Sequence, residues 1–175
     1  MNIRRTHFTP AFRTILVTAA FSCSAPVIAQ TTITSSTTTS TSTLSTATVT
    51  ATTAVVPLSG VVSGGLESVT FSGQAQVGTK VVTDPTFGSL PTVVLTIDLS
   101  NLTGVGSSTG KKYVTSNREI LTRRLSAADS VQVTFPFQSS GGAAAPLVGM
   151  ASFNLSFDVN TLKLTAASGY IGSPR

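Results

Sequence analysis

Residues 151–167, ASFNLSFDVNTLKLTAA, are the stretch that decides the fold predicted for this chain. Apolar residues occupy the odd positions from 151 to 159 and polar residues the even ones, the period-two alternation of a strand with one buried face. The alternation resumes after Asn160 and Thr161, which predicts a hairpin closed at these two residues. Its register pairs Asp158 with Lys163 on the wet face. On the apolar face it pairs Val159 with Leu162, Phe157 with Leu164 and Leu155 with Ala166.

Further alternating stretches continue the same pattern along the chain, at residues 67–77, 92–100 and 131–137. Short strands with close turn signals and no strand–helix–strand alternation are typical of all-β domains. We therefore predict for residues 54–175 an antiparallel β-sandwich of about seven to nine short strands, with a small β-barrel as the alternative. The side chains expected to fill its core are Leu95, Ile97, Val133, Phe135, Phe153, Leu155 and Phe157.

Four segments are less regular, and each receives its own interpretation. Gly73 interrupts the alternation of residues 67–77, which indicates a bulge or a close backbone approach. Pro57 makes residues 54–58 an expected edge strand, because an edge tolerates a missing N–H group. Residues 101–110 are rich in Gly, Ser and Thr and are expected to form a long loop. Residues 118–129 are interpreted as a strand that ends in one helical turn at 126–129, although a short capped helix also fits.

The N-terminal segment has the composition of an export signal. Arg4, Arg5 and Arg13 precede a short apolar run at residues 14–22, and small residues stand before Gln30. This order predicts a signal peptide over residues 1–29, cleaved after Ala29, with no transmembrane span left in the mature chain. The protein is therefore expected in the periplasm, on the cell surface or outside the cell. A lipid anchor at Cys23 is a minor alternative.

Residues 30–53 consist almost entirely of Thr and Ser. A segment with so little apolar surface and no charge is interpreted as a disordered spacer between the export signal and the domain. Two alternatives stay open. One is an O-glycosylated stalk, and the other is an added β-strand, since Thr has a high strand propensity.

Composition excludes several kinds of chemistry from the expected mature chain. His7 and Cys23, the chain's one His and one Cys, lie within the signal segment. Mechanisms of the Ser-His-Asp or Cys-His type therefore have no base or nucleophile, and zinc, copper or haem sites have no ligands. The net charge of +5 and the pI near 10.0 come from scattered basic residues with no nucleic-acid motif, so no nucleic-acid partner is expected.

The carboxylates leave two further possibilities. A pair of them would be needed for glycoside hydrolysis, and the chain offers Glu67, Asp84, Asp98, Glu119, Asp129 and Asp158. Calcium prefers oxygen ligands, and Asp98, Ser100 and Asn101 could supply them beside the Gly-rich segment. The favoured interpretation is that Asp98 caps the following loop, so no cofactor is expected.

The sequence GVGSSTGKK at residues 104–112 resembles a phosphate-binding loop at first sight. Its glycines have the wrong separation, and Lys112 stands where that motif requires Ser or Thr. We interpret the segment as a loop whose end forms a binding rim of Lys111, Lys112 and Tyr113, because loops at one end of a sandwich often carry recognition.

These observations together predict an exported, non-enzymatic β-domain that binds a protein or glycan partner or builds a surface structure. The layout resembles that of exported bacterial proteins, a likeness that implies no activity. One alternative is a carboxylate-dependent hydrolase that acts on glycans. Another is a subunit that assembles by strand addition at an uncovered edge such as residues 54–58.

Overall fold

The computed structural model describes residues 31–42, 45–63, 65–83, 90–140 and 147–174. The predicted signal peptide lies outside these ranges. Within them the chain forms strands and no helix, so the predicted all-β class is confirmed. The strands are β1 (Thr32–Ser42), β2 (Ser45–Val62), β3 (Val69–Thr83), β4 (Thr92–Asp98), β5 (Leu102–Gly106), β6 (Lys112–Thr115), β7 (Arg118–Arg124), β8 (Ala128–Ser139), β9 (Leu147–Asp158) and β10 (Lys163–Gly172).

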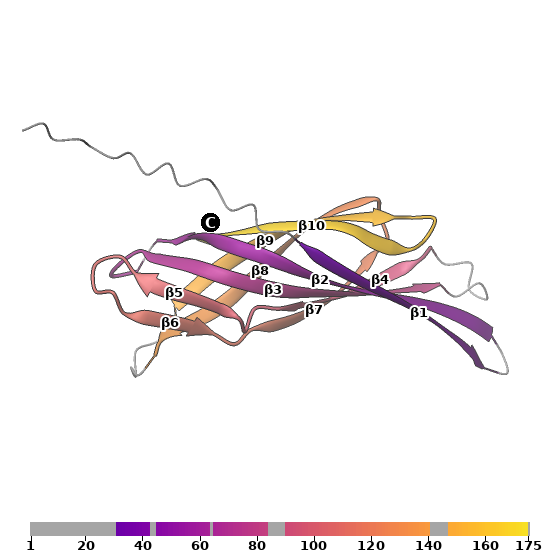
Figure 1. The fold of residues 1–175 in the computed structure, drawn as a ribbon, viewed down its shortest axis with the longest axis horizontal. Helices are drawn as coiled ribbons and strands as arrows, with labels where there is room; N and C mark the ends of the chain where they lie inside the picture. Colours follow the sequence, from indigo (N-terminus) through magenta and orange to yellow (C-terminus); the bar gives the residue numbers. More distant parts are fainter. Residues whose placement is uncertain (1–30, 43–44, 64, 84–89, 141–146, 175) are drawn as a thin grey trace, which may run out of the picture.

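All these strands belong to one mixed sheet rather than to two separate sheets (Figure 1). Its order is β1-β2-β10-β9-β8-β6-β5-β3-β4-β7, and β2 also pairs with β3. The path from β2 through β10, β9, β8, β6, β5 and β3 thus returns to β2 and forms a ring. The closing contact between β10 and β2 is parallel, with Ile171 opposite Gly60, and the other pairings are antiparallel. β1 lies outside the ring against β2, and β4 and β7 extend from β3.

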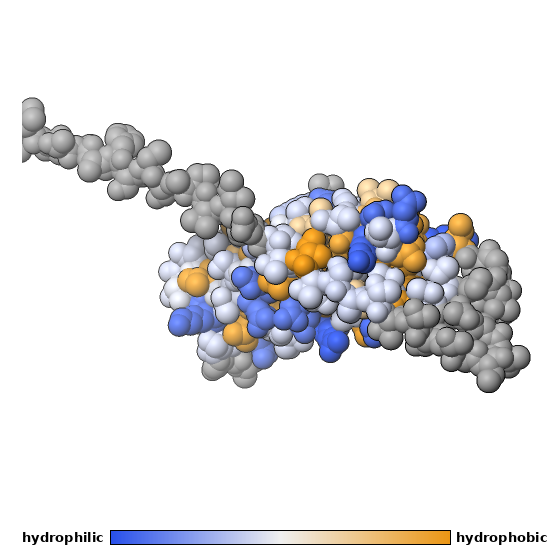
Figure 2. Space-filling view, turned by 45° about the vertical axis from the view of Figure 1, so that its right-hand side comes forward, coloured by the Kyte–Doolittle hydropathy of each residue, from blue (hydrophilic) through white to orange (hydrophobic). Residues whose placement is uncertain are grey.

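The core fills the inside of this ring. Along β4, β8 and β9 the inward side chains alternate with more exposed ones, as the sequence predicts. Phe71 is fully buried and contacts the rings of Phe135 and Phe137 edge-on, with centroids 5.5 and 4.9 Å apart. All seven side chains expected in the core are buried: Leu95, Ile97, Val133, Phe135, Phe153, Leu155 and Phe157. On the outer face shown in Figure 2, apolar residues form small groups among hydrophilic ones.

The predicted hairpin of β9 and β10 is confirmed, but part of its predicted register is wrong. Asp158 pairs with Lys163 and Phe157 with Leu164, as predicted. Beyond them the register shifts between Leu164 and Ala166, so Leu155 lies opposite Ala167 instead of Ala166. A bulge of this kind cannot be read from alternation alone, because it changes the pairing without changing the sequence pattern.

The turn of this hairpin also differs from the prediction. Val159 and Leu162 form no pair on the apolar face; they belong to a turn over residues 159–162, and Val159 is exposed. The Asp158 carboxylate closes this turn, because it accepts hydrogen bonds from the Asn160 N–H at 2.9 Å and from the Thr161 hydroxyl at 2.7 Å. These bonds favour the ionised carboxylate and lower the pKa of Asp158, most strongly through Thr161.

The loop predicted for residues 101–110 is wrong, because its first half is the strand β5. Gly104 faces the core, where the ring of Phe71 fills the space that a side chain would take. A β-carbon at Gly104 would lie 2.7 Å from Cγ1 of Val69 and 2.8 Å from Cε1 of Phe71. The glycine here therefore makes room for a neighbouring strand and does not mark a turn.

Gly73, by contrast, behaves as predicted. It has a φ angle of +150°, and a β-carbon there would collide with the backbone oxygen of Asn101 and lie 3.1 Å from Cα of Leu102. Only glycine fits readily where the backbone has this conformation and approaches so closely.

Residues 54–58 are not an edge strand. They lie inside β2, fully paired with β3, and the pairing with β1 reaches from Ser42 to Thr32, which lies opposite Val55. Pro57 lies two residues beyond Val55, the last residue that β1 covers. The edge strands of the sheet are β1 and β7.

The Thr/Ser tract, interpreted as a disordered spacer over residues 30–53, forms a hairpin in the structure. Its first part is β1, and its second part is the beginning of β2. The alternative of an added strand is the one that the structure contains. The physical reason is that β2 continues into the apolar run at 54–58, so β3 orders the whole strand and β2 in turn orders β1.

The ambiguous segment 118–129 is partly as predicted. Its first part is the strand β7, but the helical turn expected at 126–129 is wrong, because β8 begins at Ala128. The Arg123 Nε atom lies 2.9 Å from Oδ2 of Asp129 and joins the two strands across the bend.

Candidate functional site

The segments that meet at one end of the sheet enclose a pocket of about 420 Å³. We call it the end pocket. The segment before β3, the turn between β5 and β6, the end of β8 and the start of β9 contribute its walls. Figure 1 shows β5 and β6 at this end and the tip of the β1–β2 hairpin at the other. The residues that line the end pocket are Leu66, Glu67, Ser108, Thr109, Lys111, Tyr113, Phe137, Gln138, Ser139 and Leu147.

Glu67 is the polar centre of the end pocket. Its Oε1 atom accepts hydrogen bonds from the Thr109 hydroxyl at 2.7 Å and from the Tyr113 hydroxyl at 2.9 Å. Its Oε2 atom accepts bonds from the backbone N–H groups of Ser108 at 3.1 Å and Thr109 at 3.0 Å. A carboxylate on the loop before β3 thus holds the turn that joins β5 to β6.

Two neighbours fix this carboxylate in place. Gly106 lies directly beneath it, and a β-carbon at Gly106 would collide with the carboxylate oxygens. The Tyr113 ring packs edge-on against Phe137 with a centroid distance of 5.7 Å, which orients its hydroxyl toward Glu67. A bulkier residue at 106 would push Glu67 away from its donors.

The hydrogen bonds shift both pKa values. The Thr109 hydroxyl is the largest cause that lowers the pKa of Glu67, from an ordinary 4.5 to about 2, with the Thr109 N–H next. Accepting bonds stabilise the ionised carboxylate. The hydrogen bond that the Tyr113 hydroxyl donates to Glu67 raises the pKa of Tyr113, because it stabilises the protonated hydroxyl. Glu67 is therefore ionised at neutral pH, and its carboxylate holds the turn between β5 and β6.

One wall of the end pocket is apolar. Leu66 is fully exposed and Leu147 is 37% exposed, while the ring of Phe137 lies buried behind them. These two exposed leucines lie together beside a hollow, whereas other exposed apolar residues do not line it, and apolar groups of this kind commonly mark contact sites. Lys111 adds a positive charge at the same mouth.

The predicted rim of Lys111, Lys112 and Tyr113 is divided by the structure. Lys111 and Tyr113 line the end pocket, whereas Lys112 does not and is exposed on the alternate face of β6. Tyr113 is only 8% exposed, so its ring supports the pocket and its hydroxyl serves Glu67. Sequence reasoning missed Glu67 and the two leucines, since their partners are distant in sequence.

The calcium candidates Asp98, Ser100 and Asn101 lie at the end of β4. The Oδ1 atom of Asp98 accepts hydrogen bonds from the Ser100 hydroxyl at 2.6 Å and from the Ser100 N–H at 2.9 Å. These bonds lower the pKa of Asp98, the hydroxyl most strongly. The arrangement is a strand end capped by its own aspartate. Among the described residues, no three His, Cys, Asp or Glu side chains gather into a metal site.

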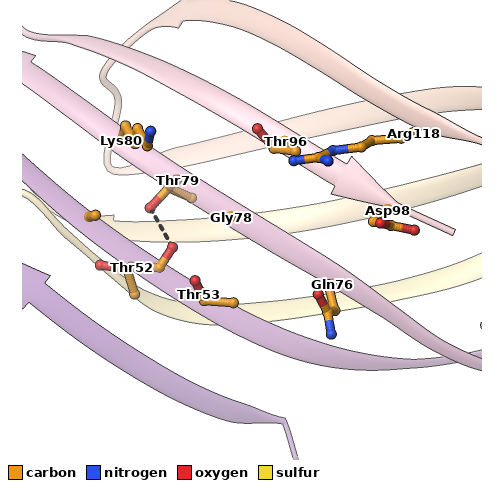
Figure 3. A pocket seen from close by; sticks show the side chains of 10 residues that line it. Thr52, Thr53, Gln76, Gly78, Thr79, Lys80, Thr96, Asp98 and Arg118 are labelled. Atoms are coloured by element: carbon orange, nitrogen blue, oxygen red, sulfur yellow. Dashed lines mark hydrogen bonds between the residues drawn. The ribbon is translucent and has the colours of Figure 1, made fainter. Parts of the chain in front are cut away.

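A second hollow of about 330 Å³ lies on the outer face of β2, β3 and β4 (Figure 3). Gly78 leaves its floor open between Thr53 and Thr96, which flank it on the neighbouring strands. Figure 3 shows Arg118 reaching from β7 toward Thr96, near Asp98. Its walls are polar, and its charges of both signs lie close enough for Arg118 to lower the pKa of Asp98. We regard it as a solvated surface depression.

Three described carboxylates, Glu67, Asp98 and Asp158, have lowered pKa values. A general acid at neutral pH needs a raised one. Asp129 forms an ion pair with Arg123, and Asp84 lies outside the described ranges.

Within the residues that the structure describes, no helix has the length and apolar character to cross a membrane.

Comparison with known proteins adds no family to this picture. No protein-family model, no curated protein and no solved structure matches the chain.

Proposed function

We propose that this chain is an exported, non-enzymatic binding domain that holds an apolar side chain of a partner protein in the end pocket. The observation that carries the proposal is the pair of exposed leucines, Leu66 and Leu147, at the mouth of a hollow whose polar centre is already occupied. Binding sites are typically concave and largely apolar, with a few fixed polar groups.

The charges at the mouth favour a partner that carries an acidic group beside the apolar one. All four donors around Glu67 are directed at its own carboxylate, so this residue is not free to bind a ligand. Lys111 is exposed at the same rim and is available to pair with a partner carboxylate. A glycan is less well served, because sugar sites usually offer an exposed aromatic face and Tyr113 is buried.

The fold supports a binding role by providing a rigid base for this end. We interpret the ring, with β4 and β7 extending from it, as a small barrel, the alternative expected from the sequence, closed by the pairing of β10 with β2. Loops at the end of such a framework are common recognition sites. The lowered pKa values of Glu67, Asp98 and Asp158 support a role without catalysis.

Export is part of the proposal and has a direct test. The intact mass of the protein secreted by its expression host should equal that of residues 30–175, which supports cleavage after Ala29. A mass that carries a diacylglyceryl group on Cys23 would instead support the lipid-anchored form. A mass of the whole chain in the cytoplasm would contradict export.

Binding can be tested with a phage-displayed library of random peptides and the full chain as processed by the host. The Thr/Ser tract must be kept, because residues 32–42 and 45–53 form part of the sheet. We expect enrichment of peptides that combine a large apolar residue with an acidic one. Their affinity should fall about tenfold or more in Leu66→Ser and in Lys111→Glu, since the first variant removes the apolar contact and the second reverses the charge that would pair with the acidic residue.

The matched control is Val159→Ser, which changes an exposed apolar residue in the β9–β10 turn. It should leave binding unchanged. Enriched peptides that bind Leu66→Ser as well as the parent would place recognition elsewhere. A library with no enrichment, together with binding on a glycan array, would replace the protein partner by a glycan.

A further inference from the structure

β1 is an edge strand with a free side. On one side it pairs with β2 without interruption, from Thr32 opposite Val55 to Ser42 opposite Ser45. On the other side the described residues provide one hydrogen bond, from the Thr31 hydroxyl to the Ala167 carbonyl at 3.0 Å, just before the strand begins. The backbone groups along the rest of that side therefore have no partner strand in the described chain. Such a row is a template for another strand.

The sequence of β1 contains none of the features that usually protect an edge. Its residues TITSSTTTSTS include no charge, no proline and no glycine, and its pairing with β2 has no bulge. Natural sheets normally block an edge with lysines, prolines, bulges or short strands. An edge of this length and composition is therefore open to pairing.

β7, the other edge of the same sheet, provides the contrast. It carries Arg118, Glu119, Arg123 and Arg124 in seven residues. A second strand laid against it would bring charged side chains together and would be opposed by their desolvation and repulsion. The two edges are thus unequal, and only β1 is suited to pairing.

We propose that β1 pairs antiparallel with β1 of a second copy of this chain, which joins two sheets across a twofold axis. Antiparallel pairing of a strand with itself satisfies this symmetry, because residue i of one copy then meets residue j of the other, and residue j meets residue i. Since β1 has no charge, self-pairing brings no like charges together. Apart from Ile33, which packs partly against the core, its residues carry small hydroxyl side chains, and Thr–Thr and Thr–Ser pairs across strands are favourable.

The exposed side chains leave room for this arrangement on both faces. Thr32, Thr34 and Ser36 are exposed on the face of β1 that continues the outer side of β2, and Ser35 and Thr37 are exposed on the opposite face. Neither face must be uncovered before a second strand approaches. The turn between β5 and β6, which helps to line the end pocket, lies at the opposite end of the sheet from the far end of β1 (Figure 1), so pairing through β1 leaves the pocket accessible.

The test measures the mass of the full chain in solution, as processed by its host, by light scattering after size-exclusion chromatography. We expect a dimer. The double variant Thr34→Lys/Ser36→Lys should raise the dimer dissociation constant about 10- to 100-fold, because the shared edge then carries four like charges, two from each copy. The control Thr122→Lys adds a charge to an exposed position of the opposite edge and should remain a dimer.

A charge exchange makes the result independent of any folding defect. The variant Thr34→Glu/Ser36→Glu should also be a monomer, and mixing it with the lysine variant should restore a dimer that contains one copy of each. A parent protein that stays monomeric at the highest attainable concentration would overturn the proposal. Failure of the mixed dimer to form, or dissociation by Thr122→Lys alone, would also overturn it. A dimer that contains a different protein would identify another occupant of the edge and overturn self-pairing.

Discussion

The ring around Phe71 and the hairpin of β1 and β2 have the same antiparallel geometry but draw their order from different sources. In the ring, large apolar side chains face inward from every strand and exclude water. In the hairpin, small hydroxyl side chains such as Thr32 and Thr34 stay exposed, and order comes from the backbone pairing with β2. Apolar burial thus determines which part of the sheet contributes most of the stability, while a long paired strand can still form outside the core.

The largest loss of stability is expected when a buried side chain is removed from the centre of the ring. Phe71→Ala removes a fully buried ring that contacts Phe135 and Phe137. We expect a loss of about 3–5 kcal/mol in the free energy of unfolding, measured by chemical denaturation. A loss below about 1 kcal/mol would show that the ring is not the main source of stability.

The closure of the ring should be the next most sensitive place. A β-carbon at Gly60 would collide with the backbone oxygen of Ile171, so Gly60→Ala must separate β2 from β10. We expect a loss of about 1–3 kcal/mol and faster hydrogen exchange at the end of β10. Gly172→Ala is the control, because nothing lies within 4 Å of the added carbon. Equal effects of the two variants would argue against a closed ring.

The end pocket should add a smaller, pH-dependent contribution. The pKa of Glu67 falls from 4.5 to about 2 on folding, so the unfolded chain binds the proton more tightly between these values. Its stabilising effect is complete above about pH 4.5 and is lost as the pH falls through about 2. Glu67→Gln should therefore show a smaller drop in unfolding free energy between pH 6 and pH 2.5 than the parent. Identical pH profiles would contradict the hydrogen bonding described for this carboxylate.

A substitution in the hairpin of β1 and β2 should have the smallest effect on the free energy of unfolding. Thr34→Ala changes an exposed side chain on β1 and should alter the free energy of unfolding by less than about 0.5 kcal/mol. Amide exchange along β1 should be faster than along β8, because the former opens without exposing the core. A large loss for Thr34→Ala, or protection of β1 equal to that of β8, would remove the difference between the two regions.

Alternation in the sequence predicts the strands whose order is local. Leu95, Phe135 and Phe153 lie on faces that can be read from their neighbours, and the structure buries all three. β5 could not be recognised in this way, because Gly104 makes sense only when Phe71 is placed beside it. β1 likewise depends on β2, which orders it from outside the tract.

The candidate site is less predictable than the fold for the same reason. Tyr113 and Lys111 could be identified at the end of a Gly-rich segment. The role of Glu67 instead depends on Ser108 and Thr109, which lie beyond β3, β4 and β5 in the sequence and are brought next to Glu67 by the fold. The antiparallel pairing of β3 with β5, which puts Val69 opposite Gly106, brings these groups together.

The seam between Gly60 and Ile171 has a kinetic consequence. One side of it lies near the start of the ring-forming sequence and the other lies in the last strand, so the ring cannot be completed until the whole chain is available. Contacts between such distant residues form slowly. If the chain is exported as we propose, this delay would keep it unfolded while it crosses the membrane and would postpone folding until the last strand has emerged.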